Sequence, residues 1–195
     1  VFVSSHLLNH ALGIFGVAVM SEAQLWRTAV WRSWPGSIVL IGAAATHASL
    51  ALWRAANRRT WRMPPLEAIQ IALGLLIPYL LVGHIVGTRV ASSWAGLPDN
   101  YPIILRRLWP DYAQMQTLAV LVVWGHGVIG LYYAMHVRRW FAPLRIPLAI
   151  LAALVPALAL AGFVAASREA ALLTLAPESW TQAQYDVQVS AFTNG

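Results

Sequence analysis

Long runs of apolar residues dominate the chain, and its charged residues lie in the short segments between these runs. Five runs without Asp, Glu, Lys or Arg hold at least 21 residues each. Because about 20 apolar residues in a helix cross the hydrocarbon core of a bilayer, the pattern predicts five transmembrane helices. We place them at residues 2–20, 36–57, 66–88, 113–137 and 146–166.

The runs do not alternate apolar and polar positions over segments of about 10 residues, as a transmembrane β-barrel would, so the pattern favours an all-α fold. Composition agrees, because 59% of residues are hydrophobic and 10% are charged, against about 25% charged in soluble domains. We therefore predict one transmembrane helical bundle over 1–166 and a polar, extramembranous tail over 167–195. The chain begins with Val inside the first predicted helix, so we expect further sequence on both sides, with room for a sixth helix beyond its end.

Cysteine and lysine are absent from the sequence. Their absence excludes disulfides, thiolate metal sites, Cys-ligated iron–sulfur clusters and covalently attached haem within this chain, as well as lysine-dependent nucleotide sites. The 13 basic residues are all Arg, and the formal net charge is +6. These arginines lie between the apolar runs, which indicates membrane topology rather than a nucleic-acid surface. Their slight excess on the N-terminal side of the predicted bundle favours a cytoplasmic location for that side.

Histidines occur in each of the first four predicted helices, at His6, His10, His47, His84 and His126. Ionisable side chains inside a bilayer are costly and mark functional sites, although a hydrogen-bonded structural histidine is the alternative for any one of them. Gly, Ala and Ser flank these histidines, and small residues alone are typical of close helix packing. Small residues around an imidazole also suit a flat macrocycle held between helices, with the imidazole bound to its metal. We interpret the remaining histidine, His136, as an interfacial residue.

Depth along the helices suggests how these histidines pair. His47 and His126 lie about 11 and 13 residues from the outer ends of their helices, or roughly 16 and 20 Å. They therefore form the deeper pair. His84 lies about 4 residues, roughly 6 Å, from the outer end of its helix, so its partner lies on the first helix. Depth alone favours His10 over His6 for that role.

Two arginines follow these histidines on the same predicted helices. Arg89 lies five residues after His84, and Arg54 lies seven residues after His47. Arginine binds carboxylates well, so both are candidates to bind the propionate groups of a haem. The alternative is that both are positive flanks that set the membrane topology.

Four short segments resemble the di-haem cytochrome b of succinate:quinone oxidoreductases and fumarate reductases, namely Ser5–His10, Thr46–Ala48, Gly83–Arg89 and His126–Leu131. The resemblance implies two haem b groups, each held by a pair of histidine ligands. In this scheme His47 and His126 hold the proximal haem. His6 and His84 hold the distal haem, with His10 as the substitute for His6.

Longer stretches resemble one branch more closely, the membrane anchor of bacterial class III adenylate cyclases, at residues 6–13, 58–64 and 124–131. Such anchors are expected to have six helices in the bacterial inner membrane, followed by a cytoplasmic catalytic domain. No residues of a cyclase domain occur in this chain, so whether it is part of an enzyme stays open. The resemblance also implies that Gly127 borders a haem.

We therefore predict a di-haem b-type cytochrome domain that exchanges electrons with the quinone pool, as a redox-sensing membrane anchor or an electron-transfer subunit. The alternative is the cytochrome b subunit of a succinate:quinone oxidoreductase complex. The expected partners are membrane lipid, quinone, a cytoplasmic catalytic or iron–sulfur domain and a second copy of the chain, with no nucleic acid. We expect the quinone site near the outer haem, under the loop at residues 89–111.

Two other interpretations are weaker. A bacteriochlorophyll-binding protein needs one histidine for each metal and no pairing across helices. A transporter or proton channel with histidine relays would be expected to use intramembrane carboxylates as well, and the five apolar runs contain none.

Overall fold

Helices form almost the whole of residues 1–175, which are the residues that the computed structural model describes. No strand occurs within this range, as the all-α prediction requires. The elements are α1 (Phe2–Ala11), the 3-10 turn η1 (Leu12–Phe15), α2 (Val17–Trp31), α3 (Trp34–Ala56), α4 (Pro65–Ile85), the π-helical turn η2 (Val86–Val90), α5 (Ala91–Ala95), α6 (Tyr101–Leu108), α7 (Ala113–Met135) and α8 (Phe141–Leu175).

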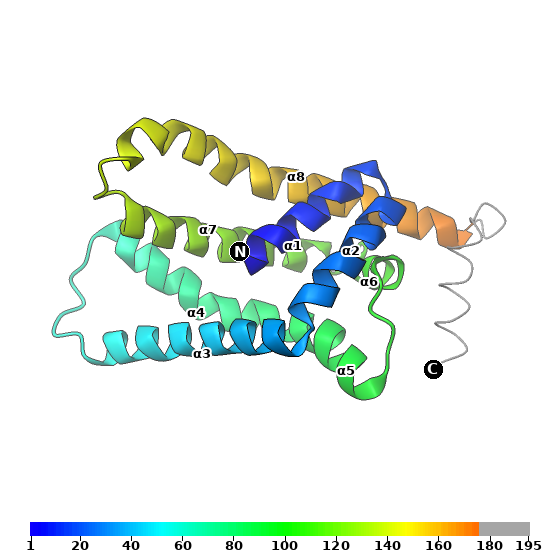
Figure 1. The fold of residues 1–195 in the computed structure, drawn as a ribbon, viewed down its shortest axis with the longest axis horizontal. Helices are drawn as coiled ribbons and strands as arrows, with labels where there is room; N and C mark the ends of the chain where they lie inside the picture. Colours follow the sequence, from blue (N-terminus) through cyan, green and yellow to red (C-terminus); the bar gives the residue numbers. More distant parts are fainter. Residues whose placement is uncertain (176–195) are drawn as a thin grey trace.

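Within residues 1–175, four helical segments are long and apolar enough to cross a membrane. They are Trp34–Ala56, Pro65–Ala95, Ala113–Met135 and Phe141–Leu173. Each contains most or all of one predicted helix, from the second to the fifth. The chain therefore has the helices of a multi-pass membrane bundle, and Figure 1 shows α4, α7 and α8 running along one another.

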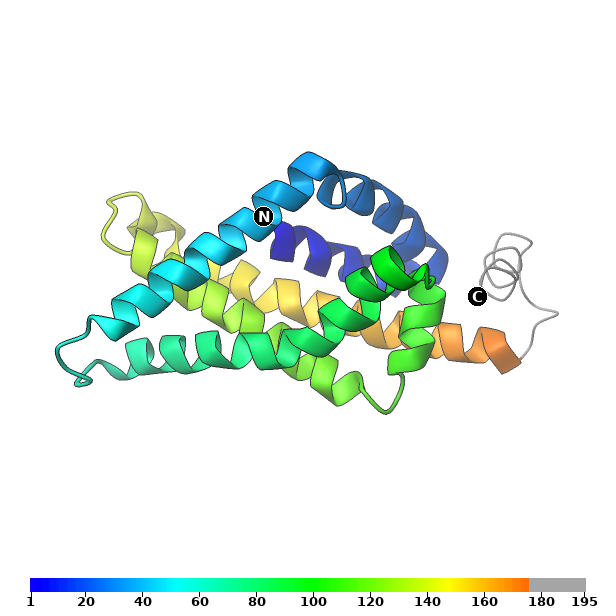
Figure 2. The ribbon, with the colours of Figure 1, turned by 90° about the horizontal axis from the view of Figure 1, so that it is seen from below.

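Helix α3 stands apart from the other long helices. Next to the loop that joins α3 to α4, Arg58 and Glu67 form an ion pair of 2.7 Å. From that end the two helices diverge toward the start of α3 (Figure 2). No residue of α3 is buried, and residues 41–54 are exposed on every side of the helix. The side of α3 that faces the bundle therefore lacks the close packing that joins α4 to α7.

The prediction of one transmembrane helix at residues 2–20 is wrong. Helix α1 ends at Ala11, and α2 begins at Val17 after the short turn η1. The chain reverses at Gly16. Its backbone φ angle of 112° is one that residues other than glycine rarely adopt. The result is a hairpin of two short helices, so four helices rather than five within residues 1–175 reach the length needed to cross a membrane.

Two polar contacts hold this hairpin closed. The side-chain amide of Asn9 donates a hydrogen bond of 2.9 Å to the backbone oxygen of Met20, which joins α1 to α2. The carboxylate of Glu169 on α8 accepts a hydrogen bond of 2.8 Å from the backbone nitrogen of Val17. A carboxylate at this position satisfies a free N–H group and the positive end of the helix dipole of α2.

The main buried core lies where the hairpin packs against α6 and α8. Its buried members are Val17, Met20, Tyr101, Leu105, Phe163, Ala166 and Ala170. Helix α8 approaches the hairpin closely through two glycines, because a Cβ atom on Gly13 or Gly162 would run into the backbone of the opposite element. This packing fixes the position of α1 relative to the long helices.

Helix α8 continues past residue 166, where we predicted the last transmembrane helix to end and the tail to begin. Ser167 and Ala170 are buried. The charged residues that suggested an end have partners instead, since Arg168 lies over the ring of Trp109 at 5.8 Å and Glu169 caps α2. The first part of the predicted tail, 167–175, is therefore helical, and the remainder at 176–195 lies outside the described residues.

The cap of α2 gives a testable prediction. Replacing Glu169 by Ala should lower the free energy of unfolding by about 1–2 kcal/mol, since the N–H of Val17 loses its acceptor. Thermal unfolding in detergent measures this as a lower Tm. The control is Glu22→Ala, which removes an exposed carboxylate from α2 itself and should leave Tm nearly unchanged. Equal Tm values for both variants would show that the cap does not stabilise the hairpin.

Candidate functional site

His47 and His126 face each other across the gap between α3 and α7. Their ring centroids are 6.0 Å apart and the ring planes cross at 83°. The Nδ1 atom of His126 is 3.0 Å from the backbone oxygen of Gln70 on α4. Because a carbonyl oxygen only accepts, Nδ1 carries the proton and donates it, and Nε2 keeps a lone pair that can bind a metal.

Helix α4 also sets how closely the His126 ring approaches. A Cβ atom on Gly74 would lie 2.9 Å from Cε1 of His126, which is closer than real Cβ contacts allow. Only glycine at this position lets the imidazole approach α4 this closely. The ring of His126 is therefore positioned by two features of α4, the carbonyl of Gln70 and the missing side chain of Gly74.

His6 and His84 form a second pair, between α1 and α4. Their centroids are 5.8 Å apart, with an angle of 61° between the ring planes. His84 lies at the point where α4 passes into the π-helical turn, and the hydroxyl of Thr88 in that turn donates a hydrogen bond of 2.6 Å to the His84 backbone oxygen. The Nδ1 atom of His6 is buried and has no hydrogen-bond partner among residues 1–175.

The spacing of both pairs matches two imidazoles on opposite sides of one metal ion. With a metal–nitrogen bond of about 2.0 Å and a ring centre about 1.1 Å behind the nitrogen, the two centroids would be about 6 Å apart. No group of three or more His, Cys, Asp or Glu that could hold a metal ion occurs in the part of the chain that the structure describes. Each pair supplies two ligands, which suits a metal whose remaining ligands come from a flat macrocycle.

Three glycines on the helices that carry paired histidines have open space where a side chain would lie. A Cβ atom built on Gly42, Gly83 or Gly127 would meet nothing within 4 Å, and all three are exposed. By contrast, Gly74 and Gly130 lie against side chains of the facing helix. Gly83 and Gly127 are next to paired histidines in the sequence, and Gly127 is the glycine that we predicted to border a cofactor.

His6 lies opposite His84, whereas the depth argument favoured His10. The reason is the early end of α1: the outer end of this helix is near residue 11 and not near residue 20, so counting from the predicted end placed both histidines too deep. The His10 ring lies 4.7 Å from the His6 ring, 5.5 Å from Tyr101 and 6.2 Å from Phe163. It packs beside the pair and not across from His84.

The two predicted propionate partners lie in different surroundings. Arg89 hydrogen-bonds the hydroxyl of Ser37 at 2.6 Å and the backbone oxygen of Trp31 at 3.4 Å. These bonds tie the π-helical turn to the junction between α2 and α3. Arg54 is exposed near the end of α3, two turns beyond His47. His136 is exposed and stacks on Tyr132, as an interfacial residue can.

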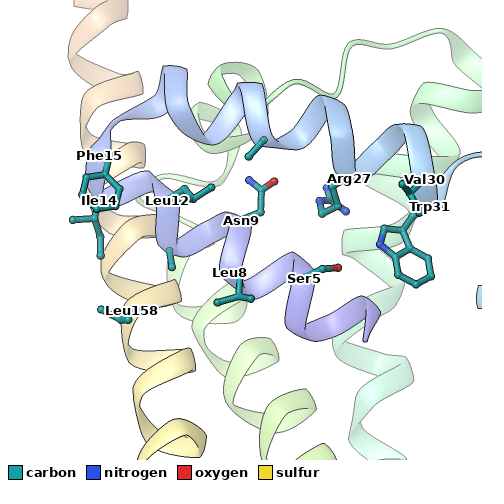
Figure 3. A pocket seen from close by; sticks show the side chains of 12 residues that line it. Ser5, Leu8, Asn9, Leu12, Ile14, Phe15, Arg27, Val30, Trp31 and Leu158 are labelled. Carbon is teal, nitrogen blue, oxygen red and sulfur yellow. The ribbon is translucent and has the colours of Figure 1, made fainter.

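Arg27 was not predicted as a functional residue, because the residues between 20 and 36 were interpreted as a loop between two transmembrane helices. Arg27 lies on α2, and its side chain extends toward α1, which carries His6 and His10 (Figure 3). Burial raises the pKa of the neighbouring Tyr101 phenol on α6 to about 12, although the charge of Arg27 opposes this rise. Apolar residues lie on both the buried and the exposed sides of α2, so the hydropathy pattern carried no signal for this arginine.

A cavity of about 560 Å³ opens between α1 and α2 next to Arg27. Figure 3 shows Asn9 reaching into it from α1 and Arg27 reaching toward α1 from α2. The rest of its wall is mostly apolar and includes Leu8, Leu12, Ile14, Phe15, Val30, Trp31 and Leu158.

Comparison with known proteins adds no family to this geometry. No family model, curated protein or solved structure matches the chain.

Proposed function

We propose that the chain is a di-haem b-type membrane cytochrome domain that exchanges electrons with the quinone pool. The observation that carries this proposal is the presence of two imidazole pairs, each reaching across from one helix to another at the separation of two ligands on one iron. A structural histidine needs a hydrogen-bond partner and not a second imidazole 6 Å away. Two independent pairs with the same spacing support a shared chemical purpose.

In this proposal His47 and His126 hold one haem, and His6 and His84 hold the other. The bound iron would take up and release single electrons. The chain's own residues orient the ligands: the carbonyl of Gln70 keeps the proton of His126 on Nδ1, and the glycines near the pairs leave room for the porphyrin faces.

The two pairs lie at different depths along the long helices. His84 lies ten residues after Gly74, the neighbour of His126, which is about 15 Å along a helix. Two redox centres at this separation would divide the thickness of a bilayer of about 30 Å. This arrangement supports electron exchange across the membrane in preference to storage at a single site.

The resemblance of short sequence segments to di-haem cytochromes b extends this proposal. The domain would act in a bacterial inner membrane as a redox-sensing anchor or an electron-transfer subunit, with lipid and quinone as partners. A cytoplasmic catalytic or iron–sulfur partner, and a second copy of the chain, would complete the assembly. The alternative is the cytochrome b subunit of a succinate:quinone oxidoreductase, and co-purification of a flavoprotein–iron–sulfur pair with the native protein would favour it.

Bacteriochlorophyll binding and proton transport are less well supported by the geometry. A pigment metal with one histidine ligand would leave the second imidazole of each pair without a purpose. A proton relay would place its histidines in a hydrogen-bonded series, whereas the rings of His47 and His126, with centroids 6.0 Å apart, are not joined by a hydrogen bond. Paired ligation of iron accounts for both the facing rings and the open positions beside them.

Haem content of single variants tests the assignment of ligands. The purified protein should contain two haems for each chain, with the difference spectrum of reduced b-type haem. His47→Ala and His126→Ala should each retain one haem, and so should their double variant, since both residues serve the same iron. His6→Ala and His84→Ala should lose the other haem, and the double variant His47→Ala/His84→Ala should contain none.

His136→Ala is the matched control for these variants, because it removes an exposed imidazole from the end of α7. It should retain both haems. A colourless, iron-free wild-type protein would overturn the proposal. The assignment of ligands would also be wrong if the two single variants of one pair, such as His47→Ala and His126→Ala, each lost a different haem.

Adding one methyl group to α4 at Gly74 should prevent binding of the haem between His47 and His126 and leave the other haem bound. Gly74→Ala places a Cβ atom 2.9 Å from the His126 ring and should push this ligand out of position. The same methyl group in Gly125→Ala would meet Leu73 at an ordinary 3.6 Å and should leave both haems bound. Haem quantification by difference spectroscopy compares the two variants. Two haems in Gly74→Ala would show that this glycine does not position the ligand.

A further inference from the structure

Arg27 is a partly buried cation without a carboxylate partner. The two ion pairs found within residues 1–175 use other arginines, Arg32 with Asp99 and Arg58 with Glu67. The Nε atom of Arg27 is buried and has no hydrogen-bond partner in this part of the chain. A guanidinium stays charged at every pH that a protein tolerates, so Arg27 cannot lower its energy by losing a proton.

A neighbour of Arg27 on α6 is the phenol of Tyr101, and burial raises its pKa to about 12, which keeps it protonated and uncharged. An unpaired cation in such surroundings is costly unless an anion accompanies it. The residues around Arg27 therefore leave a place for an anionic group that the described part of the chain does not provide.

We propose that Arg27 binds a carboxylate of the porphyrin held between His6 and His84. This inference rests on the proposed function. Haem b carries two carboxylates on one edge, several ångström from the iron, and Arg27 extends from α2 toward α1, the helix that carries His6 (Figure 3). Arginine binds carboxylates through paired, charge-assisted hydrogen bonds, so Arg27 would orient the acidic edge of this haem toward α2.

Arg89, the residue that we expected in this role, has other bonds. Two of its guanidinium nitrogens already donate, one to the hydroxyl of Ser37 near the start of α3 and one to the backbone oxygen of Trp31 at the end of α2. Arg27 instead extends from α2 toward α1 (Figure 3). Its buried Nε without an acceptor is the feature that distinguishes it from Arg89.

The cavity between α1 and α2 suggests a competing anion. Its apolar wall could take an acyl chain, and Arg27 is also part of its lining. A lipid phosphate on Arg27 would then replace the porphyrin carboxylate. Because Arg27 extends toward the helix that carries His6, the porphyrin is favoured, and a binding titration separates the two anions.

The test uses haem and its dimethyl ester, in which both carboxylates are blocked. The His47→Ala chain, purified from haem-deficient cells, has only the His6–His84 site, and absorbance titration gives its Kd for each compound. The chain with Arg27 intact should bind haem at least tenfold more tightly than the ester. Arg27→Leu and Arg27→Gln should lose this preference by weakening haem binding while ester binding changes less than about twofold.

Arg32→Leu is the matched control, because it removes a charge from the end of the same helix that is already paired with Asp99. It should keep the preference for haem, and Arg27→Lys should keep part of it. In the complete protein, Arg27→Leu should also lower the midpoint potential of one haem and leave the other unchanged, since a positive charge near iron favours the reduced form.

Three results would overturn the inference. Arg27→Leu could weaken haem and ester binding equally, which would show a structural role. It could leave the preference intact and instead reduce co-purified anionic phospholipid, which would assign Arg27 to the cavity. Failure of the wild-type and His47→Ala chains to bind either compound would overturn the proposed function as well, whereas the first two results would leave that proposal standing.

Discussion

The separation of α3 from the other long helices is the constraint on which the whole site depends. A helix in a bilayer is held to its neighbours by close packing and interhelical hydrogen bonds, and no residue of α3 is buried. Arg89 secures the start of α3 through Ser37, and an ion pair lies at its far end. Between them, the His47 ring faces the His126 ring at 6.0 Å. A flat, rigid group bound by both rings would supply the packing that the middle of α3 lacks.

Helix α4 contributes to both imidazole pairs. It positions His126 through the carbonyl of Gln70 and the bare backbone of Gly74, and it carries His84 at its other end. The second pair depends in addition on the hairpin of α1 and α2, because the reversal at Gly16 and the packing on α8 determine where His6 lies. The deeper pair is thus built on two long helices and α4, and the outer pair on a hairpin that polar contacts hold closed.

The sequence predicted the long helices well, because an uninterrupted apolar run has few other stable forms in a bilayer. It did not predict the hairpin, since hydropathy does not register the backbone angle of Gly16, and that error carried the depth argument toward His10 instead of His6. The end of the last helix was placed too early because the pairing of Glu169 with the start of α2 is a contact between segments far apart in the chain. Arg27 was missed for the same reason: its importance lies in what surrounds it in space.

Electron paramagnetic resonance of the oxidised, purified protein at low temperature tests the central claim most directly, because the spectrum of ferric haem reports the ligands on both faces of the iron. Two iron centres that each lie between paired imidazoles should give two low-spin signals. Ring planes crossed at 61° and 83° should make both signals the strongly anisotropic type of crossed imidazoles. A high-spin signal from iron with one histidine, or a protein without haem iron, would contradict the account.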